Sequence, residues 1–258
     1  MKKAKVIILR TAGTNCDKET VLAFQICGAE TELVHINQLI SKEKSLKEYN
    51  ILAIPGGFSY GDDIAAGIVL ANELRYKLEK DVQDFVKQGK LIIGICNGFQ
   101  VLVKTGLLPH STLTFNTSGK FEARWVYLKN VNRKKCIFTK GIDVIYLPVA
   151  HGEGKFITDR ETLETMKAED EIAFKYVNEE GKDCDYPLNP NGSLENIAGI
   201  CSKQGNVFGL MPHPERFIML QQHPHWTRLR QSPTKKNTPS GDGVQIFKNA
   251  VLHAKKHL

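Results

Sequence analysis

A cysteine between two glycines is the clearest candidate for chemistry in the sequence. The stretch from Ile92 to Gln100 reads IIGICNGFQ, with Cys96 between Gly94 and Gly98. The residues before it resemble a buried parallel strand, and those after it continue as a short helix. We therefore expect Cys96 at a sharp strand-to-helix turn, where residues packed against a nucleophile must lack side chains. The helix N–H groups favour the thiolate, which is the form that attacks carbonyl carbon.

Two H-x-E triplets each offer a base and a carboxylate that could orient it. His151 and Glu153 lie in HGEGKF, and His213 and Glu215 lie in MPHPERF. Residues two apart in an extended chain point the same way, so each carboxylate can face its own imidazole. The second triplet directly follows the strand-like VFGLM, and Pro214 stiffens its spacing. The second triplet is therefore the better candidate for a base and its orienting group.

Glycines after another strand-like run offer backbone hydrogen-bond donors. The sequence PGGFSYGDD, residues 55–63, directly follows ILAI. Glycines let backbone N–H groups turn towards a ligand, as they do in an oxyanion hole. Pro-Gly-Gly is also common turn chemistry, so this motif alone does not decide between the two interpretations.

The other cysteines are dispersed and contain no C-x-x-C pair, so the sequence indicates neither a disulfide framework nor a zinc site. We expect most of them to be reduced structural thiols. Cys16, in TAGTNCD, lacks the glycine-flanked turn and is a poor rival nucleophile. Its motif is expected to close the first loop over a helix start, with Thr14 or Asn15 as the N-cap.

Strand-like and helix-like segments alternate through the first half of the chain. Strand-like runs start at Val6, Glu32, Ile51 and just before Cys96, with helix-like stretches at 18–27 and up to residue 88. This rhythm is typical of a parallel sheet covered by helices. Later segments are shorter and strand-like, at 122–131, 144–149, 172–177, 197–201 and 207–211. We predict an α/β fold with a mostly parallel central sheet flanked by helices, and an additional small mixed or antiparallel sheet.

Composition excludes several classes of protein. The 258 residues are 41% hydrophobic and 24% charged, which is ordinary for a soluble globular chain. The apolar run near the N-terminus is too short for a signal peptide or a membrane span, so a cytoplasmic protein is expected. Most of the net charge of +7 lies beyond Trp226, and the nearly neutral remainder carries no nucleic-acid-binding motif. We expect neither membrane nor nucleic-acid binding.

The basic C-terminal segment forms the second of two expected regions, 1–226 and 227–258. Residues 231–243 are predicted to form a mobile loop, and a final helix is predicted over 244–256. The segment is interpreted either as a solvated tail or as a surface that docks an acidic face of a partner.

Taken in order, PGGFSYGD, GICNGFQ, HGEGKF and MPHPER resemble the signature series of the class I (triad) glutamine amidotransferases. With TAGTNCD and NTSGKFEARWV, the chain is most similar to the glutaminase subunits of phosphoribosylformylglycinamidine synthase, from de novo purine synthesis. The resemblance extends over residues 5–226 and is weaker beyond Trp226. It implies the flavodoxin-like fold of these amidotransferases as a single α/β domain.

The resemblance also implies roles for particular residues. Cys96 corresponds to the nucleophile, His213 to the base and Glu215 to the group that orients the base. The N–H groups of Gly57 and Asn97 correspond to the oxyanion hole. The substrate-pocket motifs correspond to Gln100, His151 and Glu153.

The implied reaction is hydrolysis of L-glutamine through a cysteine thioester, with release of ammonia. Ammonia would pass to a synthetase that uses ATP and Mg²⁺ to convert formylglycinamide ribonucleotide (FGAR) to the amidine (FGAM). This chain has no P-loop, so the synthetase is expected as a separate subunit, together with a small accessory subunit. The chain itself is expected to need no cofactor and no metal.

Two other function classes remain open at this level. One is a different thiol hydrolase or amidotransferase on a similar sheet, against which NTSGKFEARWV argues. The other is a non-enzymatic interaction protein that retains a relic of the turn. The presence of both His213 and Glu215 argues against that second class.

Overall fold

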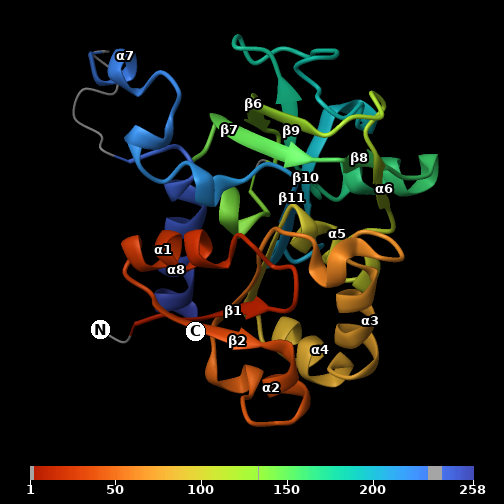
Figure 1. Cartoon of the computed structure of the whole chain (residues 1–258), viewed down its shortest axis with the longest axis vertical. Coiled ribbons are helices and arrows are strands. Elements are labelled where there is room, and N and C mark those ends of the chain that lie inside the picture. The colour runs from red at the N-terminus through yellow and green to blue at the C-terminus, as the bar shows by residue number, and fades with distance from the viewer. Residues whose placement is uncertain (1–2, 133, 232–239) are drawn as a thin grey trace.

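The computed structural model describes residues 3–132, 134–231 and 240–258 (Figure 1). Its strands are β1 (Lys5–Arg10), β2 (Glu30–His35), β3 (Ile51–Ile54), β4 (Leu91–Ile95), β5 (Thr112–Phe115), β6 (Glu122–Asn130), β7 (Val144–His151), β8 (Glu153–Ile157), β9 (Ile172–Val177), β10 (Ile197–Cys201) and β11 (Val207–Leu210). Its α-helices are α1 (Asp17–Ile26), α2 (Ile36–Ile40), α3 (Ile68–Tyr76), α4 (Glu79–Lys87), α5 (Asn97–Thr105), α6 (Arg160–Ala168), α7 (Trp226–Gln231) and α8 (Val244–His257). Short 3-10 helices are η1 (Leu46–Glu48), η2 (Ser59–Asp62), η3 (Ile137–Thr139), η4 (Leu194–Asn196), η5 (Pro214–Arg216) and η6 (Leu220–Gln222).

The first half of the chain forms the parallel part of a large sheet. Neighbouring strands run parallel throughout the order β2-β1-β3-β4-β11. Strands β3 and β4 are buried along their whole length, as expected for central strands with helices on both faces. The α/β fold class predicted from the alternating pattern is therefore confirmed.

The second half of the chain continues the same sheet with antiparallel strands. Beyond β11 the order is β10-β9-β6-β7, and each neighbouring pair is antiparallel. The small additional sheet is the antiparallel pair β5 and β8. The main sheet is thus mixed, because the later strands extend its edge instead of forming a layer of their own. Strand β11 returns to pair with β4, which brings the residues after β11 beside those after β4.

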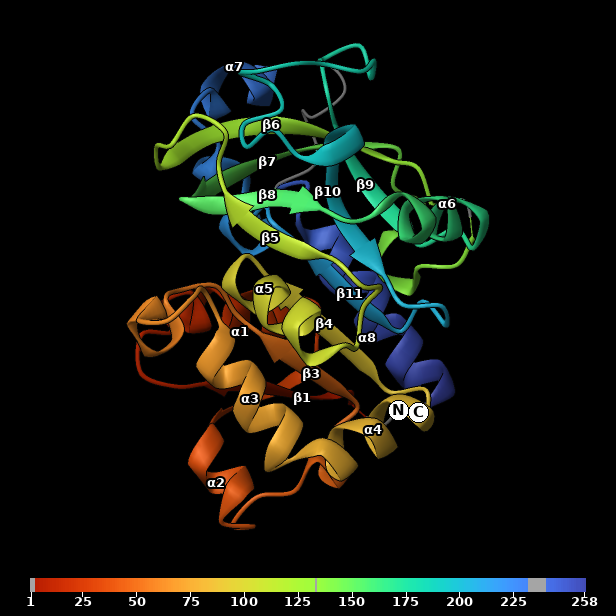
Figure 2. The same cartoon turned by 90° about the vertical axis from the view of Figure 1, so that its right-hand side faces the viewer.

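Helices cover the parallel part of the sheet on both faces. Figures 1 and 2 show α1 and α8 on one face and α3, α4 and α5 on the other. The amphipathic stretch predicted up to residue 88 is two helices, α3 and α4, separated at Lys77 and Leu78. Leu78 is buried at this break, so the change of direction keeps its side chain in the core.

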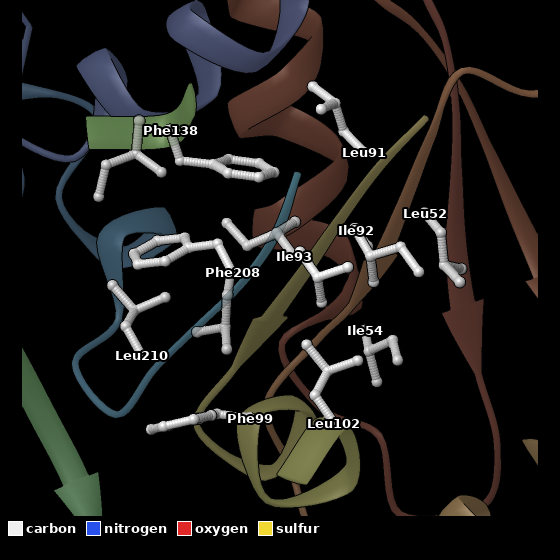
Figure 3. Close-up of a cluster of buried hydrophobic side chains, with 14 of the residues drawn as sticks. Leu52, Ile54, Leu91, Ile92, Ile93, Phe99, Leu102, Phe138, Phe208 and Leu210 are labelled. Atoms are coloured by element: carbon white, nitrogen blue, oxygen red, sulfur yellow. The ribbon is translucent and has the colours of Figure 1, made fainter. Parts of the chain in front are cut away.

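One cluster of the hydrophobic core lies around β4, β11 and the helix α5, as Figure 3 shows. Phe208 on β11 pairs with Ile93 on β4, and both are fully buried. Phe99 on α5 packs so closely on β11 that a Cβ added to Gly209 would lie 2.2 Å from its ring. Each such large apolar side chain contributes about 1.5–3 kcal/mol through burial. This packing fixes α5, and with it the turn that precedes α5.

The C-terminal helix α8 is part of the same hydrophobic core. Its buried residues are Ile246, Phe247, Ala250, Val251 and Ala254. Phe247 meets Phe24 of α1 edge to face, with ring centroids 5.0 Å apart. The helix predicted over 244–256 is present, whereas most of the loop predicted over 231–243 lies outside the described residues. Removal of the chain from residue 231 onwards would therefore strip one face of the sheet.

Within the described ranges, no helix is both long and apolar enough to cross a membrane.

Candidate active site

Cys96 occupies the sharp turn between β4 and α5. Its backbone has φ 51° and ψ −105°, a conformation that few residues other than glycine adopt. A Cβ added to Gly98 would lie 1.9 Å from the Ile54 carbonyl oxygen, and one added to Gly94 would lie 2.5 Å from that of Gly98. The two glycines are thus required by close packing, for the reason that the sequence pattern indicated. The thiol is held at the carboxyl end of β4, at the start of a helix.

His213 and Glu215 form a buried pair beside Cys96. Glu215 Oε1 accepts a hydrogen bond from His213 Nδ1 at 2.6 Å, and the two side chains are 2% and 0% exposed. The spacing was expected to be extended, but the triplet enters the 3-10 helix η5, with Pro214 as its first residue. Proline suits this position because its fixed φ matches a helix start and its missing N–H is not needed there. The turn, and not an extended strand, aims the carboxylate at the imidazole.

The Nε2 atom of His213 is available to interact with Cys96. His213 Nε2 is buried and has no hydrogen-bond partner among the described residues. A Cβ added to Gly56 would lie 2.8 Å from His213 Cε1 and 3.5 Å from Cys96 Cβ, so the two side chains converge on this glycine. Burial alone would lower the pKa of His213, but the nearby Glu215 and Cys96 raise that pKa well above its ordinary value. The geometry suits a thiolate–imidazolium pair.

Two backbone N–H groups belong to residues directly beside this site, Gly57 next to Gly56 and Asn97 next to Cys96. Gly56 O accepts hydrogen bonds from the N–H groups of Asn15 and Cys16, whereas the Gly57 N–H has no hydrogen-bond partner in the described part of the chain. Gly57 has φ 144°, and a Cβ there would lie 2.6 Å from the Gly13 carbonyl oxygen. Asn97 is the first residue of α5, and helical geometry leaves its N–H without an intrahelical acceptor. These two free N–H groups are the ones expected to form an oxyanion hole.

The triplet that begins at His151 has a different geometry. His151 ends β7 and Glu153 starts β8, and His151 Nδ1 lies 3.1 Å from Asn116 Oδ1. The Asn116 amide nitrogen donates to the carbonyl oxygens of Lys120 and His151, so its oxygen faces the ring and Nδ1 carries the proton. Burial, reinforced by the charge of His213, lowers the pKa of His151 to about 3. His151 is therefore neutral, and its buried Nε2 has no partner among the described residues.

A network of side-chain hydrogen bonds that the sequence patterns did not indicate joins the glycine loop to α5. Asn97 Nδ2 donates to Asp62 Oδ1 at 3.1 Å and to Gln100 Oε1 at 3.0 Å. Asn97 Oδ1 accepts from the Ser59 N–H at 3.2 Å. Gln100 Nε2 in turn donates to the Glu153 carbonyl oxygen at 2.6 Å. Asp62 belongs to the quoted PGGFSYGDD, but only its contact across the fold reveals this role.

The predicted N-cap of the first helix is wrong. The N-cap of α1 is Cys16, without a side-chain capping bond, and its carbonyl oxygen accepts from the Thr20 hydroxyl at 2.7 Å. Thr14 instead accepts from the Thr11 N–H, and Asn15 Oδ1 accepts from the Cys16 thiol. The loop is held against Gly56 and Gly57, so its polar side chains close the loop itself and leave the helix start uncapped.

Cys16, His213 and Glu215 each place one potential metal ligand atom within 4.8 Å of the others. Two contacts oppose a cation there. Arg216 Nη2 donates to Cys16 Sγ at 3.0 Å, which places a guanidinium charge against the cluster. The His213–Glu215 hydrogen bond already occupies Nδ1. The cluster is better suited to hold a proton than a metal ion.

Comparisons with known proteins show which family this chain resembles. A family model described as a CobB/CobQ-like glutamine amidotransferase domain matches residues 3–254. The chain is 50% identical to the phosphoribosylformylglycinamidine synthase subunit PurQ of Dehalococcoides mccartyi, over 99% of this chain and 100% of that protein. Its identity to the subunit of the same name from Archaeoglobus fulgidus is 42%, over 99% of this chain and 98% of that protein.

A solved structure entitled "Structure of PurLQS from Thermotoga maritima" contains a similar chain, with a TM-score of 0.74 and 32% identity over 98% of this chain and 99% of that one. A glutamine amidotransferase from the same organism has a TM-score of 0.53 at 17% identity, over 99% of this chain and 94% of that one, which shows a shared fold. The fold and the site together define a glutamine amidotransferase. More narrowly, the chain belongs to the family of PurQ subunits of phosphoribosylformylglycinamidine synthase.

Proposed function

We propose that this chain hydrolyses L-glutamine with Cys96 as the nucleophile, as the glutaminase subunit of phosphoribosylformylglycinamidine synthase. The observation that carries this proposal is the convergence of Cys96 and His213 on Gly56, with Glu215 bonded to the far side of the imidazole. A thiol, a base and an orienting carboxylate in this order are what acyl transfer through a thioester requires.

The proposed reaction has two acyl-transfer steps. The Cys96 thiolate attacks the side-chain amide carbon of glutamine, and the N–H groups of Gly57 and Asn97 stabilise the oxyanion. The His213 imidazolium gives its proton to the leaving nitrogen, so ammonia departs and a glutamyl thioester remains. The now neutral His213 takes a proton from water, and the hydroxide adds to the thioester carbon. The C–S bond then breaks, so glutamic acid leaves and Cys96 departs as the thiolate. The proton that His213 took from water stays on the imidazole, which restores the starting pair.

Three further residues are proposed to line the glutamine pocket. His151 stays neutral, so its bare Nε2 is an acceptor for a substrate N–H group. Gln100 is buried and holds the backbone of Glu153 in place. Burial raises the pKa of the Glu153 carboxyl, which lies near the charges of Lys104 and Asp62. A partly buried carboxylate at the pocket is suited to an ammonium group of the substrate.

We propose that the ammonia passes to a separate synthetase subunit, which binds ATP and Mg²⁺ and converts FGAR to FGAM. A small accessory subunit is proposed to complete the assembly. The similarity to a chain in the structure entitled PurLQS supports these partners. The cysteines of the described residues are all free thiols, which fits the proposed cytoplasmic location.

Replacement of the nucleophile tests the proposal. With the synthetase present, Cys96→Ala is expected to abolish glutamine-dependent FGAM synthesis and leave ammonia-dependent synthesis intact. The matched control is Cys184→Ala, which removes a half-buried thiol from the loop after β9 and should leave both activities unchanged.

A thiol-alkylating glutamine analogue should label wild type at Cys96 and nowhere else. If Cys96→Ala loses both activities, Cys96 is structural. If the analogue leaves Cys96 unlabelled, a different thiol hydrolase is favoured. Absence of glutaminase activity in wild type with its partner would favour an interaction protein.

A further inference from the structure

The thiol of Cys16 lies behind the catalytic histidine and has no part in the reaction proposed above. Cys16 Sγ is 3.9 Å from His213 Nδ1, and the residue is fully buried. It belongs to the loop between β1 and α1, whereas His213 follows β11, 197 residues later. The two residues meet only because the fold brings these two loops together.

Cys16 is held in place by hydrogen bonds of both its backbone and its thiol. Its N–H donates to Gly56 O at 3.2 Å, and its carbonyl oxygen accepts from the Thr20 hydroxyl at 2.7 Å. Its thiol donates to Asn15 Oδ1 at 3.1 Å. The sulfur therefore occupies one fixed position, and a fixed group can restrict the orientation of whatever packs against it.

The imidazole of His213 is enclosed by fixed groups. Glu215 bonds Nδ1, the backbone at Gly56 lies against Cε1, and the sulfur of Cys16 lies on the Nδ1 side. Within the described residues, Nε2 is the edge that keeps no partner. Loss of the sulfur would remove the polar contact that restrains the ring on the Nδ1 side, so the ring could tilt away from Cys96.

Arg216 gives Cys16 a second connection to the site. Arg216 directly follows Glu215, and its Nη2 donates to Cys16 Sγ at 3.0 Å. The sulfur of Cys16 thus accepts a hydrogen bond from the charged guanidinium of Arg216 and also contacts the imidazole of His213.

We infer that Cys16 is a positioning residue for the glutaminase reaction, which holds His213 and Arg216 in the arrangement that aims Nε2 at Cys96. This inference depends on the function proposed above. A misplaced base lowers the rate of the chemical step, because proton transfer requires a near-ideal geometry. Glutamine binding is not expected to change, because Cys16 lies on the far side of the ring from Nε2.

The test compares variants of Cys16 in the complex with the synthetase. Cys16→Ala is expected to lower the kcat of glutaminase by roughly 10–100-fold, with the glutamine KM nearly unchanged. Ammonia-dependent synthesis should stay at the wild-type level. Cys16→Ser keeps a donor and an acceptor and should recover part of the loss. The limb of the pH profile that titrates His213 should move to lower pH in Cys16→Ala, since a contact that favours the imidazolium is lost.

Matched variants separate positioning from packing. Cys136→Ala removes another buried thiol, remote from Cys96, and should leave kcat and the pH profile unchanged. If Cys16→Ala does not fold, Cys16→Val fills the volume without polar contacts and is expected to show the same loss and the same pH shift.

A Cys16→Ala or Cys16→Val enzyme with the kcat and pH profile of Cys136→Ala would overturn the inference. Labelling of Cys16 by the glutamine analogue would overturn it as well, because Cys16 would then be a nucleophile. If wild type forms no thioester, the proposed function fails. If wild type forms it and the Cys16 variants match wild type, only the positioning role fails.

Discussion

His213 and His151 begin triplets of the same form, H-x-E, yet the fold gives them opposite electrostatic environments. The pKa of His213 is raised well above its ordinary value, chiefly by Glu215 against the effect of burial, whereas that of His151 is lowered to about 3 by burial and by His213. Both rings are buried and both use Nδ1 for a hydrogen bond. The difference lies in the partner, which is a carboxylate for one and an amide oxygen for the other.

Local backbone geometry decides which partner each histidine finds. The 3-10 helix η5 turns Glu215 back onto its own histidine. At the other triplet the chain passes from β7 to β8 across Gly152, and Asn116 occupies the position beside Nδ1. One histidine is consequently suited to carry a proton, and the other to remain a neutral acceptor. Identical spacing in sequence thus yields two different hydrogen-bond partners for the imidazole.

The largest expected effect is that of removing the base. His213→Ala should lower the rate of thioester formation by about a thousandfold or more, since a nucleophile and its base act as one unit. Mass spectrometry of enzyme quenched with glutamine would measure the thioester. Ammonia-dependent synthesis serves as the control. Equal thioester yields in wild type and His213→Ala would assign the base elsewhere.

Removal of the orienting carboxylate should have a smaller effect. Glu215→Gln keeps the size of the side chain but loses the charge that raises the pKa of His213, and a fall in kcat of about a hundredfold is expected. Steady-state glutaminase assays in the complex would measure it. A loss as large as that of His213→Ala would show that the carboxylate does more than orient the imidazole.

Substitution in the triplet that begins at His151 should act on binding. His151→Asn removes the neutral acceptor and is expected to raise the glutamine KM by about tenfold, the cost of roughly one hydrogen bond, with a minor change in kcat. Initial rates over a range of glutamine concentrations would separate the two constants. A selective fall in kcat would instead make His151 a participant in the chemical step.

The two histidines should also affect stability in opposite directions on acidification. His151 binds a proton near pH 6.5 when unfolded but only near pH 3 when folded, so folding stability falls as the pH drops through this window. From pH 7.5 to pH 5.0 the contribution is a loss of about 2 kcal/mol. His213, whose folded pKa is raised, contributes stability that is fully present below pH 6.5 and is lost as the pH rises through that folded pKa.

Urea unfolding at pH 7.5 and 5.0 isolates the contribution of His151. His151→Asn should lose less stability on acidification than wild type does. Asn116→Asp is the matched variant, because a carboxylate beside Nδ1 would raise the pKa of the folded-state histidine towards that of His213. If acidification lowers the free energy of unfolding equally for wild type, His151→Asn and Asn116→Asp, then His151 is not buried in its neutral form.

The sequence alone determined the features that depend on neighbouring residues. A strand, a glycine-flanked cysteine and a helix in succession placed Cys96 at a sharp turn, because the strand, the turn and the helix are each set within a few residues, as is the packing of Gly94 against Gly98. The same local order gave the parallel strands and predicted the final helix. The motif series also indicated the family, and the comparisons confirmed it.

Contacts between distant segments were decided by the tertiary structure. The pairing of β11 with β4 brings His213 to Cys96, and 35 residues separate Asn116 from His151, whose charge state Asn116 helps to set. The contact of Cys16 with His213 spans 197 residues. No local pattern carries such pairings, because the environment that sets a pKa is built by whichever segments the sheet order brings together. The N-cap prediction for α1 failed for this reason, since Gly56 and Gly57 hold that loop.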